Sequence, residues 1–443
     1  QKLKLLVLPI AIQNFMLALV SATDAIMLGW IDQTSLSAVS LAGQVQFVLS
    51  LFISGIAAGA GIMAAQYWGK QDAASIEKVI PIALRTNLLF SGLFTILAGF
   101  CPEILMRIFT NDAALVASGS QYLRAVALSY VLCGISQVYL ILLKNTGHAA
   151  VSSRISSTAV VLNIILNAIL IYGLCGAPAL GIRGAAYATV AARVVELIWA
   201  YLETKKPERV RILWNRLFSS AGKILSEDFW RYTLPVLAAS LVWGIAYVLY
   251  SVIMGHMGSD AVAANSITSI AKSLLSCLIR GVSGGAGVLI GNLLGADELE
   301  KAREYGGRLT HLAIAIGVVT GGLLMLISPA IVHFAPLTDT AAEYLQYMLL
   351  FCGLNLMAQS VNTTVLDGIF CAGGDAKFDM QGNIGAMWCF SVPLGFLAAF
   401  WLKLPVMVVY CIVNLDEIVK LPAVYLHYKK YVWVRNITRD IEE

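Results

Sequence analysis

Charged residues are scarce in this chain. Aspartate, glutamate, lysine and arginine make up 13% of its 443 residues, whereas a soluble globular domain carries about 25%. Apolar residues make up 59%, and the mean hydropathy is +0.79. So few charges over so long a chain exclude an ordinary soluble protein and predict one that lies in a lipid bilayer.

The chain also lacks the residue patterns of catalytic and metal centres. Its 8 cysteines are scattered singly, without a CxxC pair or a Cys/His cluster, so neither a zinc site nor a redox pair is indicated. No HExxH or GxSxG motif stands in a catalytic context. We therefore expect no enzyme and no cofactor.

What the chain has instead is a series of long apolar runs. A run of about 20 apolar residues can cross the hydrocarbon core as a helix, whereas barrel strands would be about ten residues with alternating polarity. The sequence therefore predicts an all-α membrane protein with twelve transmembrane helices. The runs are 5–30, 41–67, 80–101, 119–143, 155–175, 181–203, 229–257, 262–293, 308–334, 341–371, 381–401 and 405–427.

The basic residues fall mostly on one side of these runs. If the N-terminus is cytoplasmic, the even-numbered loops and both chain ends hold most of the lysines and arginines. The odd-numbered loops and their edges hold Arg107, Arg124, Arg183 and Lys403. Under the positive-inside rule, this asymmetry predicts a multi-pass protein of the plasma (inner) membrane with both termini in the cytoplasm. The net charge of +4 then reflects topology, and we expect no nucleic-acid partner.

The chain repeats itself without a gap, because residues 9–69 align with residues 235–295 at an offset of 226 residues. The identical pairs include Pro9/Pro235, Gly29/Gly255, Gly55/Gly281, Gly59/Gly285, Gly61/Gly287 and Gly69/Gly295. A solenoid unit is only about 20–50 residues long. Two parallel halves are typical of alternating-access transporters. We expect an N-lobe at 1–203, a cytoplasmic linker at 204–228, and a C-lobe with a short cytoplasmic tail at 229–443.

An acidic residue, Asp24, lies inside the first apolar run, and its repeat partner is Tyr250. A charge at the bilayer centre costs about 2.5–3.5 kcal/mol on translocon scales and marks a candidate ion or proton site. Asn163 and Asn167 lie one turn apart in the fifth run, and Thr189 lies in the sixth. These oxygens would suit a monovalent cation such as Na⁺. Proton binding by Asp24, and asparagines that only pack helices, are the alternatives. No other metal site is expected.

The second half carries different charges inside its apolar runs. Lys272 and Arg280 share a face of the eighth run, and Asp367 lies in the tenth. Asp416, Glu417 and Lys420 lie in the twelfth, where Asp416 and Lys420 form an i,i+4 pair. Lys272 or Arg280 can pair with Asp367 or Glu417. Internal ion pairs and a polar wall of a substrate cavity are both open interpretations.

Aromatic residues in the second half are candidate substrate contacts. Trp243 and Tyr250 lie in the seventh apolar run. Their rings could hold a flat organic cation through cation–π or stacking contacts, with core packing as the alternative.

Several motifs along the chain resemble one transporter family. These are Leu8-Pro9, Asp24-Ala25-Ile26-Met27-Leu28-Gly29, Ala65-Gln66-Tyr67-Trp68-Gly69-Lys70, Leu162-Asn163-Ile164-Ile165-Leu166-Asn167, Gly181-Ile182-Arg183-Gly184, Ala261-Val262-Ala263-Ala264-Asn265 and Ala372-Gly373-Gly374-Asp375. In this order they resemble the multidrug and toxic compound extrusion (MATE) transporters of the multidrug/oligosaccharidyl-lipid/polysaccharide flippase superfamily. The resemblance spans essentially the whole chain.

The resemblance implies two six-helix lobes, a central cavity, and antiport of organic compounds driven by H⁺ or Na⁺. Asp24, Asn163, Asn167 and Thr189 match the family's N-lobe cation site, and the first helix would bend near Pro9. Many members have aspartate where Asn167 stands, so Asp24 would carry the ion alone. The acidic residues of NorM-type members in the seventh and tenth helices have no counterpart, and no C-lobe sodium site is expected.

From these observations we expect a monomeric secondary transporter that exports small organic compounds. Lys272 and Arg280 are atypical for an exporter of cations and indicate an anionic or zwitterionic substrate. The candidate cavity residues are Trp243, Tyr250, Lys272, Arg280, Asp367 and Glu417. The alternative function is a lipid or lipid-linked oligosaccharide flippase of the same superfamily, which would need a long basic cavity.

Overall fold

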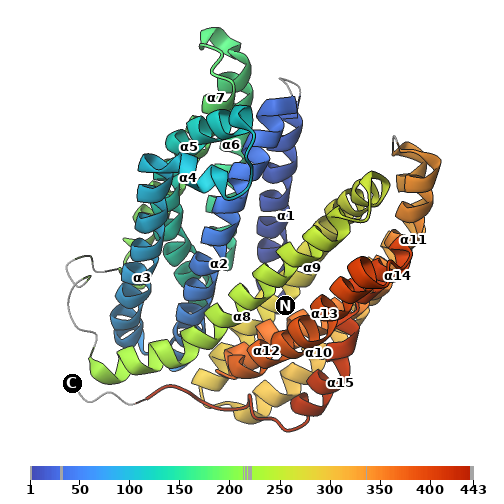
Figure 1. The fold of residues 1–443 in the computed structure, drawn as a ribbon. Helices are drawn as coiled ribbons and strands as arrows, with labels where there is room; N and C mark the ends of the chain where they lie inside the picture. The colour runs from blue at the N-terminus through green and yellow to red at the C-terminus, as the bar shows by residue number, and fades with distance from the viewer. Residues whose placement is uncertain are drawn as a thin grey trace. The chain divides into compact units, whose positions relative to one another are not determined.

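The structure is a computed structural model that describes residues 2–29, 33–212, 214, 217, 222–335 and 337–439. Part of the expected inter-lobe linker, residues 213, 215–216 and 218–221, lies outside the described residues. All regular elements of the described ranges are helices (Figure 1), which confirms the all-α prediction.

The helices of the first half follow one another through short connections. In chain order they are α1 (Lys2–Gly29), α2 (Gln33–Gly69), α3 (Ala73–Phe100), α4 (Pro102–Arg107), α5 (Ala113–Leu143), the π-helical turn η1 (Lys144–His148), α6 (Ala149–Tyr172), the 3₁₀ turn η2 (Leu174–Gly176) and α7 (Ile182–Thr204).

The second half repeats this plan but breaks its last helices. It contains α8 (Lys223–Gly255), α9 (Ser259–Gly295), α10 (Leu299–Phe334), α11 (Asp339–Thr363) with its π-helical continuation η4 (Thr364–Phe370), α12 (Ala376–Asn383), η5 (Ile384–Ser391), α13 (Val392–Phe396), η6 (Leu397–Trp401), α14 (Val406–Val413) and α15 (Asp416–Tyr428).

The helices account for the twelve expected crossings. Among the described residues, 9 helical segments are long and apolar enough to cross a membrane. One of them, Ala113–Tyr172, holds both α5 and α6 and so makes two crossings. The first helix has the shorter apolar stretch Leu6–Val20, and the last crossing is divided between α14 and α15.

Polar and glycine residues set where several helices begin and end. Asp72 and Asp112 accept hydrogen bonds from first-turn N–H groups of α3 and α5, and Thr338 does so for α11. Such side chains satisfy donors that the helix leaves unpaired. Gly173 ends α6 at φ +74°, and Gly147 turns the chain between α5 and α6 at φ +81°. These backbone angles favour glycine.

By packing, the chain divides into two compact units whose boundaries fall inside helices. One unit is Phe15–Leu237, and the other joins the residues up to Asn14 with the chain from Ala238 onward. Each half therefore packs with the opening segment of the other half's first helix. This division differs from the lobes expected at 1–203 and 229–443, which follow the sequence repeat. The connection is also shorter than 204–228, since α8 begins at Lys223.

The repeated glycines explain this exchange of segments. A Cβ on Gly59 of α2 would lie 2.7 Å from the Thr233 Cα of α8, and one on Gly285 of α9 would lie 2.8 Å from Val7 Cγ2 of α1. Thr233 and Val7 are separated by the repeat offset, as are the two glycines. The same holds one turn away, where Gly55 faces Leu237 and Gly281 faces Ala11. Small residues permit close approach of membrane helices. The repeat therefore encodes two equivalent helix–helix contacts, α2 with α8 and α9 with α1.

Candidate functional site

Asp24 lies near the end of α1, beside two amides of α6. The Nδ2 of Asn167 donates to Asp24 Oδ1 at 2.5 Å and to Asn163 Oδ1 at 3.3 Å. The Nδ2 of Asn163 in turn donates to Thr189 Oγ1 of α7 at 3.3 Å. The structure thus brings the four predicted residues of the N-lobe together in one hydrogen-bonded chain. Their role in ion binding stays a prediction.

The three helices that carry this chain are held close together. A Cβ on Gly184 of α7 would lie 2.4 Å from Leu170 O of α6, so only glycine permits this approach. Tyr172 donates to Met27 O at 2.7 Å and ties the end of α6 to the end of α1. Thr189 donates to Ala185 O within α7. These contacts fix where the amides and the carboxylate meet.

The hydrogen-bonded group Asp24–Asn167–Asn163–Thr189 leaves one amide oxygen without a donor among the described residues. Asn167 is fully buried, and its Oδ1 has no hydrogen-bond partner among the described residues. An unpaired buried acceptor costs about 1–3 kcal/mol. Likewise, the described lysines and arginines form no ion pair with Asp24. Carboxylate, amide and hydroxyl oxygens are ligands of hard cations, but Asn167 here presents its Nδ2 rather than its Oδ1 to Asp24.

Pro9, the predicted hinge, lies within α1, which is continuous from Lys2 to Gly29. It belongs to the segment of α1 that packs with the second half, whereas Asp24 belongs to the segment in the first unit. The boundary between the two units therefore falls between the proline and the carboxylate. Bending at this position stays a prediction.

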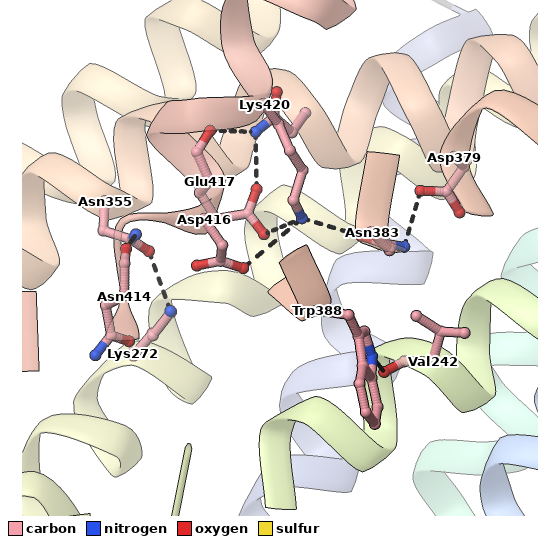
Figure 2. Close-up of polar contacts among 11 residues, drawn as sticks. Val242, Lys272, Asn355, Asp379, Asn383, Trp388, Asn414, Asp416, Glu417 and Lys420 are labelled. Atoms are coloured by element: carbon pink, nitrogen blue, oxygen red, sulfur yellow. Dashed lines mark hydrogen bonds and ion pairs between the residues drawn. The ribbon is translucent and has the colours of Figure 1, made fainter. Parts of the chain in front are cut away.

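The second half carries a larger polar network around Lys420 of α15 (Figure 2). The Nζ of Lys420 lies 3.2 Å from Glu417 Oε1 and 3.8 Å from Asp416 Oδ2, which confirms the predicted i,i+4 pair. It also donates to Asn383 Oδ1 of α12 at 3.0 Å, and Asn383 donates to Asp379 at 3.2 Å. Because Lys420 is 5% exposed, the network neutralises a charge inside the unit.

A break in the last crossing exposes a backbone carbonyl to this network. α14 ends at Val413 and α15 begins at Asp416. The carbonyl of Asn414, at the break, accepts from Asn355 Nδ2 at 2.5 Å, and Asn355 Oδ1 accepts from Lys272 Nζ at 3.1 Å (Figure 2). Lys272 thus binds an amide, and its expected pairing with Asp367 or Glu417 is not formed among the described residues. Discontinuous helices mark binding regions in transporters.

The other predicted cavity residues occupy different surroundings. Glu417 is held inside the network, because Asn362 donates to its Oε2 at 2.8 Å in addition to the Lys420 contact. Arg280 and Asp367 have exposed side chains. Asp367 interacts electrostatically with Arg280, Glu417 and Lys420. Of the six candidates, these two are the charged residues with exposed side chains.

The two aromatic candidates also differ. Trp243 is half-buried and stacks on Tyr247 with ring centroids 5.6 Å apart. Tyr250 is 9% exposed and packs in a core with Ile253 and Met387, so its ring mainly serves packing. Nearby, Trp388 donates to Val242 O at 3.1 Å (Figure 2).

Several members of the C-terminal network are not among the residues that the sequence pattern indicates. Asn355, Asn362, Asp379 and Asn383 were not among the candidates, although each bonds a charged group or the helix break. Asp379 and Asn383 are spaced i,i+4, and this spacing was the available signal. This signal was weak because Asp379 precedes the apolar run 381–401.

Comparison with known proteins supplies the family. The family model MatE matches residues 9–169 and 235–397, two stretches that begin at Pro9 and at its repeat partner Pro235. The chain belongs to the MatE family. It is therefore a multi-pass membrane transporter and not an enzyme, as the sequence predicted.

Curated relatives of this MatE chain are distant but match almost end to end. The uncharacterized transporter YisQ of Bacillus subtilis is 21% identical over 427 residues, 96% of this chain and 93% of the relative. The probable multidrug resistance protein NorM of Agrobacterium fabrum is 24% identical over 390 residues, 86% of this chain and 83% of the relative.

Solved structures show the same fold. A MOP superfamily transporter from Pyrococcus furiosus, described as having a binding pocket of reverse polarity that suggests a different function, matches with a TM-score of 0.87 at 20% identity. The match covers 97% of this chain and 95% of that one. An outward-facing multidrug resistance MATE transporter matches with a TM-score of 0.84 at 19% identity over 98% of this chain and 95% of that one. At this identity the likeness establishes the fold.

Proposed function

We propose that this MatE protein is a cation-coupled antiporter that exports small organic compounds across the plasma membrane by alternating access. The observation that carries the proposal is the chain Asp24–Asn167–Asn163–Thr189, which joins a carboxylate without a described cationic partner to an unpaired buried amide oxygen. Relatives named as probable multidrug resistance proteins support the export of organic compounds.

In this mechanism the coupling ion neutralises Asp24. A proton would remove the charge of the carboxylate. A Na⁺ ion would also engage the oxygens of Asn163, Asn167 and Thr189, after the Asn167 amide turns its free Oδ1 toward the ion. An uncompensated charge at this depth costs about 2.5–3.5 kcal/mol on translocon scales. Its neutralisation therefore changes which conformation is favoured, and the ion drives transport by its different affinity for the two states.

The position of Asp24 on α1 connects neutralisation of its carboxylate to a movement of this helix. The same helix belongs to one packing unit before Asn14 and to the other after it. A change in the contacts of Asp24 therefore acts on a helix that both units share, and Pro9 supplies a point at which backbone hydrogen bonding is already reduced. In this mechanism the helix bends there, substrate is released outward, and the protein resets to face inward.

The substrate would be anionic or zwitterionic. Arg280 is exposed, and Lys272 donates a hydrogen bond to the Asn355 amide while it also interacts electrostatically with Asp416 and Glu417. The protein would act as a monomer with both termini in the cytoplasm.

The test is solute flux in proteoliposomes under separately imposed proton and sodium gradients. Wild-type protein should move a fluorescent organic solute against its gradient when one of the two is imposed. Asp24→Asn should insert and fold but lose this coupled flux. The amide takes up no proton in this pH range and has no negative charge to attract Na⁺. Asp339→Asn is the matched control, since Asp339 is exposed at the start of α11.

Two outcomes would reject the proposal. Coupled flux that survives in Asp24→Asn would remove Asp24 as the coupling group. Gradient-independent scrambling of a labelled lipid, without flux of soluble organic compounds, would favour the flippase alternative.

A further inference from the structure

A cavity in the first unit lies apart from Asp24 and its amides. It has a volume of about 600 Å³ and is formed by α4, the start of α5 and the segment between them. This volume is in the range of small-molecule pockets. A Cβ on Gly119 would lie 2.2 Å from Met106 Cε, so the Met106 side chain of α4 packs directly against α5.

The polar groups of this cavity leave a hydroxyl without a partner. Ser120 lines it and is 5% exposed, yet its Oγ forms no hydrogen bond with the described residues. The exposed amides of Asn111 and Gln121 line the same space. The Ser120 Oγ is itself covered, so it reaches a ligand in the cavity only when its side chain turns outward, and that turn would give this unpaired hydroxyl a partner.

The lining carries one excess positive charge. Arg124 is paired with Glu103 at 3.4 Å, whereas Arg107 is exposed and forms no ion pair within the described part of the chain. An arginine with free N–H groups binds a phosphate ester more strongly than a neutral donor does. The cavity is therefore matched to a group with a single negative charge and several hydroxyls.

The cavity also lies where the membrane-spanning surface begins. The cavity follows the end of α3, where Phe100 is 82% exposed. Ile104 of α4 is 65% exposed, and Ile108, directly after α4, is 69% exposed. On α5, Leu128 is 56% exposed one turn beyond Arg124, on the face that lines the cavity. An apolar chain can thus lie against the protein directly beside the polar cavity.

We propose that this cavity binds the headgroup of an anionic phospholipid, with the phosphodiester at Arg107 and the headgroup hydroxyls at Ser120, Asn111 and Gln121. The exposed apolar side chains of α4 and α5 then contact its acyl chains. A soluble phosphate ester has the same charged group but would leave those side chains uncovered, which is why the lipid is the favoured source.

The test is lipid retention by the full-length protein in detergent, measured by native mass spectrometry. The probes are dioleoyl phosphatidylglycerol and dioleoyl phosphatidylcholine, which share acyl chains and differ in headgroup charge. Wild-type protein should bind phosphatidylglycerol about tenfold more tightly. Arg107→Ala should remove most of the preference, because the excess positive charge favours the net anion over phosphatidylcholine, whose choline cation offsets the phosphodiester that both lipids carry. Ser120→Ala should weaken binding several-fold without lowering thermal stability, since the serine hydroxyl has no partner to lose.

Matched variants separate this site from the transport mechanism. Arg183→Ala removes another exposed arginine, expected on the same side of the membrane, and should keep the preference. Asp24→Asn should also keep it, so failure of the coupling proposal leaves this test intact. Equal retention of both lipids, or equal loss in Arg107→Ala and Arg183→Ala, would overturn the proposal. So would competition by glycerol 3-phosphate as effective as that by the lipid.

Discussion

At the residue scale, the carboxylates that lie in apolar helices have different partners in the two halves. Asp24 is bonded by an amide, and the described lysines and arginines do not pair with it. Asp416 and Glu417 share the ammonium of Lys420. A carboxylate that is not neutralised by the protein needs an ion from outside, whereas one that is paired does not. This contrast supports the proposed coupling role of Asp24 in the first half and a structural role for the network of the second half.

Changing Asn167 to aspartate tests the neighbourhood of Asp24. Asn167→Asp places a second carboxyl at hydrogen-bond distance from the first, and two like charges so close cannot both ionise. The pair should therefore retain one proton to higher pH. We expect the pH profile of transport to shift upward, or sodium to become more effective, in the proteoliposome assay. An unchanged pH profile and sodium response would exclude this residue from the site.

Replacing Lys420 tests the structural role of its network. Lys420→Met leaves two carboxylates buried without their cation, and breaking a buried pair costs about 3–5 kcal/mol. We expect a clearly lower midpoint of thermal unfolding in detergent. Lys301→Met is the control, because the Lys301–Glu298 pair is exposed and its loss should leave the midpoint unchanged. Equal midpoints for the two variants would contradict the assigned role.

At the scale of helices, the sequence predicted the crossings well and their irregularities poorly. The apolar runs located every crossing because length and hydropathy decide membrane insertion. The run 405–427 gave no sign that its helix stops at Val413 and restarts at Asp416. At this break the carbonyl of Asn414 accepts a hydrogen bond from Asn355, a residue distant in the sequence. Tertiary contacts of this kind cannot be seen in a single apolar run.

The helix–helix contacts at the repeated glycines predict that one added methyl group lowers the stability of the protein. Gly59→Ala would place its Cβ 2.2 Å from Thr233 Oγ1 and 2.7 Å from its Cα, so α8 has to move. Overpacking of this kind costs about 1–3 kcal/mol, and the midpoint of thermal unfolding should fall. Gly92→Ala is the control, because nothing lies within 4 Å of its Cβ and alanine is the better helix former. A stable Gly59→Ala would show that the crossing is loosely packed.

At the scale of the whole molecule, the repeat predicted two parallel halves but not how they exchange segments. The aligned glycines mark the contact points, yet a sequence cannot say whether Gly59 meets its own half or the other. The structure shows that α2 contacts the start of α8, and α9 the start of α1. The candidate site had a similar limit. The spacing of Asn163 and Asn167 predicted a shared face, while the approach of Asp24 accompanies tertiary packing such as the Tyr172–Met27 hydrogen bond between α6 and α1.

A division of labour between the halves predicts that substrate charge and ion coupling can be changed separately. The double variant Lys272→Met, Arg280→Met removes two positive charges from the second half and leaves Asp24 and its amides intact. Under the same imposed gradient, flux of an anionic dye should fall about tenfold or more, since a charge-assisted hydrogen bond contributes about 1.5–3 kcal/mol. Flux of a cationic dye should persist with an unchanged ion dependence. If both fluxes instead fell together, or the ion dependence changed with them, the charges of the second half would belong to the coupling machinery, because a group that only selects substrate cannot alter which ion drives the cycle.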